Sequence, residues 1–329
     1  MADALGARMR PSIPELRASR ALHRWLRRAA LAAVPIVGLT ACGDNCEVTP
    51  NFRSSSILPA SVAWAPGSVH GSEECNRYCP SEYVCWHNDW DHCVVGADGK
   101  ALACTGTQTF CGSRPCGRLP SGLLSASIIQ ASVVATELAA AAHLEGAAVF
   151  AFQALERELL GHGAPEELVR RAGSAQDDER RHQSSMSRLA RRRGARVSPV
   201  VVDPAPVRTL LEVARENARE GCVREAYGAG VAAFQGEWAG DPVIRRAMRS
   251  IAIDEAEHAS LGWAVDAWAR SRLARAQRAI LDDEIAQAVF DLRNEIVRPV
   301  APEVISLLGM PGPAPAAALS LALAPLWKA

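Results

Sequence analysis

The sequence carries one short pattern twice. "DDERRH" occupies 177–182 and "IDEAEH" occupies 253–258, so each copy contains Asp-Glu-x-x-His: Asp178, Glu179 and His182, then Asp254, Glu255 and His258. Residues three apart lie on one face of a helix, and each copy therefore points a carboxylate and an imidazole at one spot. A single Glu-x-x-His in an Ala/Glu/Arg-rich helix usually arises by chance on the surface. Each copy therefore indicates a binding site only if a partner carboxylate lies at the same height on the neighbouring helix.

Breaker residues divide the chain beyond Pro120 into long helical segments. The pattern predicts helices over about 125–160, 165–193, 207–239 and 242–271, with a further helix over about 275–297. "GHGAP" and "GDP" each predict a tight hairpin. Residues 194–207 reach roughly 46 Å when extended, which exceeds the length of a helix on the order of 40 Å. The expected fold is therefore all-α: two antiparallel hairpins joined by a long crossover in a four-helix bundle.

Each copy has a partner glutamate at the same height on its hairpin neighbour. The midpoint between Glu145 and 179–182 falls at Gly163, and the midpoint between Glu225 and 255–258 falls at Asp241. Both midpoints lie in predicted turns. Glu145 should therefore face Glu179 and His182, and Glu225 should face Glu255 and His258.

All four glutamates fall within apolar stripes of their helices, so they should point inward. Buried carboxylates need counter-charge or must protonate, and two divalent cations balance four of them. One Glu from each of two helices and a Glu-x-x-His from each of the other two is the ligand pattern of di-iron and di-manganese carboxylate bundles. The expected cofactor is two Fe ions, with Mn or a mixed Fe/Mn pair as alternatives. The expected ligands are Glu145, Glu179, His182, Glu225, Glu255 and His258.

Residues near these ligands have expected roles too. Glu179 and Glu255 are candidates to bridge two metals, with Glu145 and Glu225 terminal. Asp178 and Asp254 can orient an imidazole on the same or the opposite half, or can be solvated aspartates. Cys222 is expected to be a small packing residue. His143 and His162 are expected to be surface or loop histidines.

The N-terminus has the organisation of an export signal. Seven arginines precede the apolar run "AALAAVPIVGLTA", which is too short to span a bilayer. The run ends in "LTAC", the pattern of a bacterial lipoprotein signal, so residues 1–41 should be removed and Cys42 lipidated. An ordinary cleaved secretion signal is the alternative. The expected location is the cell envelope, anchored by lipid on the periplasmic or outer-membrane face.

A Cys-rich region, 42–120, precedes the helical region, 121–298, and a Pro-rich apolar tail, 299–329, follows and should form a short helix. An even number of cysteines in an exported, turn-rich segment predicts up to four disulfides of unspecified connectivity. A zinc module that uses His87 and His92 is the alternative. The disulfide candidates are Cys46, Cys75, Cys79, Cys85, Cys93, Cys104, Cys111 and Cys116.

Charge argues against nucleic acid as a partner. The chain has 36 basic and 36 acidic residues, and loss of residues 1–41 leaves 29 basic against 34 acidic. A mildly acidic exported protein is a poor nucleic-acid binder. The expected partners are the membrane, through the N-terminal lipid, and a small molecule, O2 or peroxide.

Residues 140–297 resemble the ferritin-like superfamily, in the group that includes rubrerythrins and other carboxylate-bridged di-iron oxidases. "LEGAAVFAF", "DDERRH", "EGCVREA" and "IAIDEAEH" look like the ferritin-like lipoproteins of myxobacteria-type genomes, which also carry a Cys-rich segment and a "GRxPxGL" stretch, here "GRLPSGL" at 117–123. Those relatives commonly have His after the first Glu, where this chain has Gly146. A rubredoxin-like pair of CxxC motifs is missing, so a rubrerythrin electron relay is not implied.

The resemblance implies iron binding and, often, activation of oxygen or peroxide. Three functions fit: a metal-dependent oxidoreductase, a non-catalytic lipoprotein that binds or sequesters iron, and a structural envelope lipoprotein on the same scaffold. The presence of all six expected ligands argues against simple decay of the site. The substrate and electron donor are not specified by the sequence.

Overall fold

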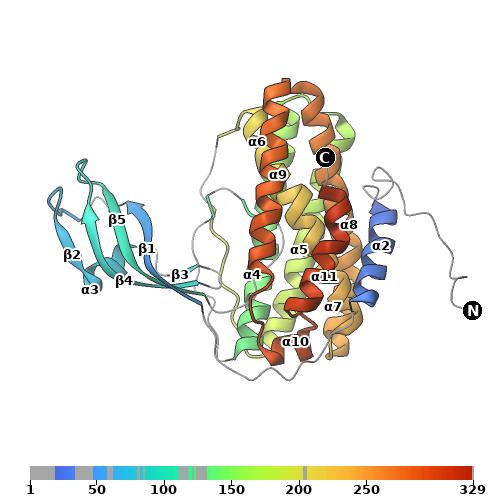
Figure 1. Cartoon of the computed structure of the whole chain (residues 1–329), viewed down its shortest axis with the longest axis horizontal. Helices are drawn as coiled ribbons and strands as arrows, with labels where there is room; N and C mark the ends of the chain where they lie inside the picture. Colours follow the sequence, from blue (N-terminus) through green and yellow to red (C-terminus); the bar gives the residue numbers. More distant parts are fainter. Residues whose placement is uncertain are drawn as a thin grey trace, which may run out of the picture.

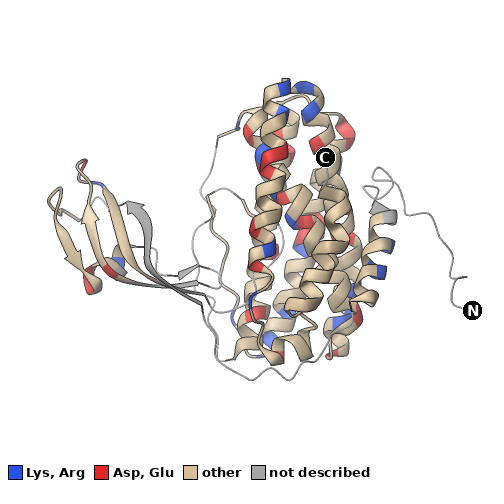
Figure 2. Ribbon diagram, in the orientation of Figure 1, with Lys and Arg blue, Asp and Glu red and all other residues tan. Residues whose placement is uncertain are grey.

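The computed structural model is mostly helical, with one small sheet near the N-terminus (Figure 1). Figure 1 shows the sheet to one side of the helices, and Figure 2 shows acidic and basic residues interspersed over the helices. The structure describes residues 19–33, 47–57, 62–79, 82–83, 86–110, 118–120, 122–123, 132–202 and 206–327.

The Cys-rich region forms an antiparallel sheet that the sequence did not predict. Its strands run in the order β1-β5-β4-β2, with β3 also paired to β4. The strands are β1 (Glu47–Ile57), β2 (Val69–Gly71), β3 (Glu82–Tyr83), β4 (Trp86–Val95) and β5 (Ala101–Phe110). The sequences of β4 and β5, "WHNDWDHCVV" and "ALACTGTQTF", lack strict apolar alternation, which is the usual signal of a strand.

Two disulfides tie the short helix α3 (Ser72–Tyr78) to this sheet. Cys75 bonds Cys93 on β4, and Cys79 bonds Cys104 on β5. Cys93 and Cys104 are cross-strand partners, so both bridges meet the sheet at one position. With Trp90 and Leu102 they form a small core. Cross-links compensate for a core of this size by restricting the unfolded chain. Four of the disulfide candidates, Cys46, Cys85, Cys111 and Cys116, lie outside the described residues.

Most of the long helices begin and end close to the predicted breakers, but the first begins at Val133, where the Ser132 side chain caps it, rather than near 125. They are α4 (Val133–Gly161), α5 (Glu166–Arg192), α6 (Leu210–Arg219), α7 (Glu225–Trp238), α8 (Pro242–Arg272) and α9 (Arg275–Glu295). Helix α4 packs mainly on α5, and α7 on α8, which are the two expected hairpins. Gly163 takes the left-handed φ of +67° in the first turn, and Asp241 caps α8 by accepting from the backbone N–H of Val243 and Ile244.

The described residues on either side of 203–205, between α5 and α6, contact α4 at two places. The Ser198 carbonyl lies 3.1 Å from Nδ1 of His143, and Arg208 binds Glu158, near the end of α4, at 2.8 Å. These contacts, fifteen residues apart on α4, span about 22 Å of helix. The segment that joins α5 to α6 is therefore a long crossover, as its length predicts.

The C-terminal tail forms two helices rather than the expected single one. These are α10 (Pro302–Leu308) and α11 (Pro313–Trp327), with a bend of 58° between them. Helix α11 packs on α7 and α9, and α10 packs on α4. By length and composition, α4 and the bent pair α10–α11 each pass as a membrane span, but 72% of the apolar window of α4 is buried inside the protein. Burial of this kind is typical of a core helix.

Residues Ser19–Ala32, within the predicted export signal, form helix α2 against α7, α8 and α11. Leu22, Leu26 and Ala30 are fully buried there. Trp238 donates its indole N–H to the Ala30 carbonyl at 2.9 Å. Cys42, the predicted lipidation site, lies outside the described residues.

Candidate metal centre

The six predicted ligands come from four helical segments and meet in one buried cluster. Ligand atoms of Glu145, Glu179, His182 and Glu255 lie within 4.8 Å of one another, and so do those of Glu225, Glu255 and His258. Glu145 comes from α4, the 179–182 pair from α5, Glu225 from the start of α7, and the 255–258 pair from α8. The cluster can therefore hold a metal ion, and its two groups share Glu255.

Glu179 and Glu255 lie between the two imidazoles. Nδ1 of His182 is 3.6 Å from Glu179 and 3.3 Å from Glu255. Nδ1 of His258 is 3.2 Å from Glu179 and 3.6 Å from Glu255. Of the two imidazoles, Glu145 contacts that of His182, at 3.4 Å from its Nδ1. This arrangement fits two bridging and two terminal carboxylates.

Each imidazole is held by the aspartate of the other copy of the motif. Nε2 of His182 lies 3.1 Å from Asp254, and Nε2 of His258 lies 3.3 Å from Asp178. Arg181 contacts both aspartates. A carboxylate on the far nitrogen fixes the ring and raises its basicity as a ligand. The sequence allows each aspartate to orient the histidine of its own half or that of the opposite half, and in the structure each contacts the histidine of the opposite half. Nδ1 of each ring faces the cluster.

The chemistry of the inward-facing atoms suits a metal. Among the described residues, the buried atoms without a hydrogen-bond partner include Glu179 Oε2, His182 Nδ1, Glu225 Oε2 and His258 Nδ1. Orphaned buried polar atoms are rare and costly. All four belong to predicted ligands, and their spacing lets one or two cations satisfy them together.

Electrostatics divides the glutamates into two classes. Burial raises the pKa of Glu145 to about 8 and that of Glu225 well above its usual range. Burial acts the same way on Glu179 and Glu255, but the imidazoles outweigh it and lower the pKa of both carboxyls. Burial thus favours the neutral carboxyl at Glu145 and Glu225, whereas the imidazoles favour the carboxylate at Glu179 and Glu255.

Burial alone would lower the pKa of His182 and His258, but the surrounding carboxylates raise it for both rings. The charged form of each imidazole and the carboxylates around it therefore stabilise one another. Divalent cations that bind to the same atoms must compete with protons at both imidazoles, at Glu145 and at Glu225.

A π-helical turn, η1 (Glu220–Arg224), precedes Glu225, whose backbone N–H bonds the Glu220 carbonyl. Such turns insert one residue and often occur at functional sites. Gly221 and Gly262 bring this turn and α8 together backbone to backbone, because a Cβ on Gly262 would lie 2.5 Å from the Gly221 carbonyl oxygen. The extra residue sets the face that Glu225 occupies, and the sequence periodicity gives no sign of it.

Arg118, from the "GRLPSGL" stretch, is a site residue that the sequence analysis missed. It is 1% exposed, and its backbone N–H donates to Oε1 of Glu225 at 2.8 Å. Its guanidinium donates to Asn217 at 2.8 Å and lies over the Phe152 ring. The motif marks the position, but a single arginine among turn residues carries no periodicity that would predict its burial.

The structure also decides the positions of three further residues. His143 is fully buried, so the prediction of a surface or loop position is wrong, because the crossover covers it. His162 does lie in the turn after α4. At Gly146, a Cβ would collide with the side-chain amide of Gln183 and lie 2.9 Å from a Val200 methyl carbon, so the crossover and α5 occupy the space that the histidine of the resembled lipoproteins would need.

Comparison of the chain with protein families, with curated proteins and with solved structures found no match. The functional interpretation therefore rests on the geometry of the cluster.

Proposed function

We propose that α4, α5, α6 with α7, and α8 form a ferritin-like four-helix bundle whose cluster binds two iron ions, and that the protein is an oxidoreductase that uses O2 or peroxide. Two observations together carry the proposal. Two groups of ligand atoms share Glu255, and both groups include residues with buried polar atoms that have no hydrogen-bond partner. Carboxylate and imidazole ligands suit iron and manganese.

Bound iron would supply the electrons for reduction of O2 or peroxide. Glu145, Glu179, Glu225 and Glu255 would hold the ions together with His182 and His258. Asp178 and Asp254 would keep both imidazoles oriented. Burial excludes bulk water, because Glu179, His182 and His258 are each 2% exposed. A dry site strengthens each electrostatic interaction within it.

The test is anaerobic loading with Fe(II), followed by addition of O2 or hydrogen peroxide. We expect oxidant consumption with oxidation of two irons per chain, and none in Glu179→Ala. Consumption that persists in a variant without bound metal would contradict the proposal. Uptake of iron far beyond two per chain would favour sequestration instead.

We also propose that the protein is an exported lipoprotein with Cys42 as its mature N-terminus. The basic, apolar and small-residue order of residues 1–42 supports it, and the two disulfides agree with an oxidising compartment. Removal of residues 1–41 would uncover the face of α7 and α11 beneath α2. Mass spectrometry of the protein from its own membranes tests this: an acylated N-terminal Cys42 is expected, and an intact Met1 would contradict it.

A further inference from the structure

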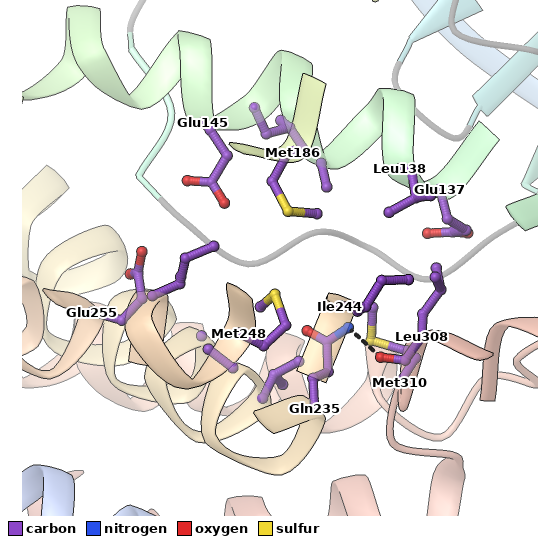
Figure 3. Close-up of a pocket in the computed structure, with 16 residues that line it drawn as sticks. Glu137, Leu138, Glu145, Met186, Gln235, Ile244, Met248, Glu255, Leu308 and Met310 are labelled. Atoms are coloured by element: carbon purple, nitrogen blue, oxygen red, sulfur yellow. Dashed lines mark hydrogen bonds between the residues drawn. The ribbon is translucent and has the colours of Figure 1, made fainter. Parts of the chain in front are cut away.

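A cavity of about 90 Å³ extends from the candidate metal centre along α4 to the C-terminal segment (Figure 3). Glu145 and Glu255 lie at one end, and Glu137, Leu308 and Met310 lie at the other. Glu145 and Glu137 are eight residues apart on α4, which corresponds to about 12 Å. The cavity is therefore long and narrow.

The cavity opens on one side of the cluster. The side chains of Glu145 and Glu255, which line it, are 18% and 9% exposed. Glu179 and Glu225 do not line it, and they are 2% and 1% exposed. A molecule in the cavity would reach the Glu145 group of ligand atoms directly.

The walls are apolar and adaptable. All three methionines beyond residue 41, Met186, Met248 and Met310, line this one cavity. Methionine is unbranched and polarizable, and it fills irregular apolar space around different ligands. Leucine, isoleucine, valine and alanine side chains supply most of the remaining wall.

The C-terminal segment forms the far end and is fixed in place. Gln235 donates its amide to the Leu308 carbonyl at 2.9 Å. Gly309 has a φ of +65°, and a Cβ there would lie 2.5 Å from the Ala239 nitrogen. The chain therefore turns at Gly309 and presents Met310 to the cavity.

We propose that this cavity binds a slender, unbranched apolar molecule or alkyl chain, with one end at Glu145 and Glu255, and that Met310 limits its length. This substrate class rests on the proposed oxidoreductase function. The volume is below the roughly 150 Å³ that accommodates benzene in an engineered apolar cavity, so an unbranched chain fits better than a ring.

The test uses 1-butanol through 1-octanol as probes, with benzyl alcohol as the bulky comparison, and calorimetry on the full chain with and without iron. Affinity should rise by about fourfold for each methylene buried and stop rising once the cavity is full. Benzyl alcohol should bind more weakly than the best straight chain.

Two variants and a matched control locate the binding. Ala141→Phe fills the half-buried wall and should abolish binding, while Ala154→Phe, also half-buried on α4 but outside the cavity, should not. Met310→Ala should move the best length to longer chains, and circular dichroism verifies the fold of each variant.

Absence of binding to the wild type, or equal binding in a folded Ala141→Phe, would overturn the cavity proposal. If the protein binds two irons and consumes oxidant but binds no alcohol, the cavity proposal is overturned and the proposed function stands. Alcohol binding by a protein that takes up no iron would support the cavity and overturn the proposed function.

Discussion

The two halves of the candidate metal centre have the same residue types but different surroundings. In one half, Glu145 lines the apolar cavity, and its side chain is 18% exposed. In the other, Glu225 and His258 are sealed, and Glu225 accepts a hydrogen bond from the backbone of Arg118. The two copies of the motif are thus paired with partner glutamates in different environments: Glu145 lines a cavity, and Glu225 is buried and bonded to Arg118.

This difference indicates that the two metal positions would have different roles. Held ligands are preorganised and favour tight binding of a metal, while an accessible ligand can shift when a small molecule arrives. We therefore expect the metal beside Glu145 to meet substrate and the metal beside Glu225 to be the more firmly bound. Glu179 and Glu255, which lie near both imidazoles, link the halves.

The largest expected effect is the loss of both metals when a shared ligand is removed. Glu255→Ala takes away the residue common to both groups of ligand atoms. Elemental analysis should find the content reduced from two metals per chain to none. Retention of one full equivalent would show that the halves are independent, and Glu257→Ala, at an exposed position two residues away, is the control.

The next effect separates the halves. Glu145→Gln and Glu225→Gln each remove one terminal ligand, so each should lower metal content from two to one. Because Glu145 lines the cavity and Glu225 does not, only Glu145→Gln should alter the reaction of the remaining metal with added peroxide. Identical behaviour of the two variants would remove the functional distinction between the halves.

Metal binding should also depend steeply on pH. The pKa of Glu145 is raised to about 8 by burial, and those of Glu225 and both imidazoles are raised as well. Because each of these pKa values is raised, protons compete with the metal for these groups, so affinity should increase as pH rises, by about tenfold per pH unit for each displaced proton. Titration in weak buffer should record proton release, with fewer protons released by Glu145→Gln because it binds one metal fewer, and an affinity independent of pH would contradict this.

A smaller effect is expected from the aspartates that orient the imidazoles. Asp254→Asn acts on His182 and Asp178→Asn on His258, because the contacts cross between the halves. Each should weaken one metal site by about 10- to 100-fold, measured by competition with a chelator. Asp177→Asn changes an exposed neighbour paired with Arg180 and should have no effect. If Asp178→Asn weakened the Glu145 half instead, the crossed arrangement would be wrong.

The smallest effect is expected from a change at Arg118, whose backbone N–H bonds Glu225. Arg118→Met keeps the backbone bond to Glu225 and removes the guanidinium, which leaves the buried Asn217 oxygen unpaired. Urea unfolding should show a loss of about 1–3 kcal/mol with unchanged metal content. Arg191→Met, at an exposed position, is the control. A loss of metal without a loss of stability would show that the guanidinium itself tunes the site.

The sequence predicted the elements that depend on periodicity. The four long helices, both hairpin turns and the crossover follow from apolar spacing and breakers, and the midpoints at Gly163 and Asp241 predicted which glutamates face each other. Features that depend on single residues did not follow. The π turn before Glu225 and the burial of Arg118 arise from tertiary contacts that have no local signature.

The Cys-rich sheet escaped prediction for another reason. Its disulfides replace much of the apolar core that would otherwise impose an alternating pattern on β4 and β5. His143 was misassigned because one histidine on an alanine-rich helix carries no sign of the crossover that covers it. The cavity, likewise, depends on Met310 returning from the end of the chain to α4, α7 and α8.

The most direct test of the central claim is elemental analysis of the protein purified from the cells that naturally make it, beside a Glu179→Ala/Glu255→Ala variant. Both glutamates lie between the two imidazoles, so their removal should abolish binding. We predict two irons per chain in the natural protein and none in the folded variant. A folded natural protein without metal would contradict the account and leave the repeated motif as a relic of a site no longer in use.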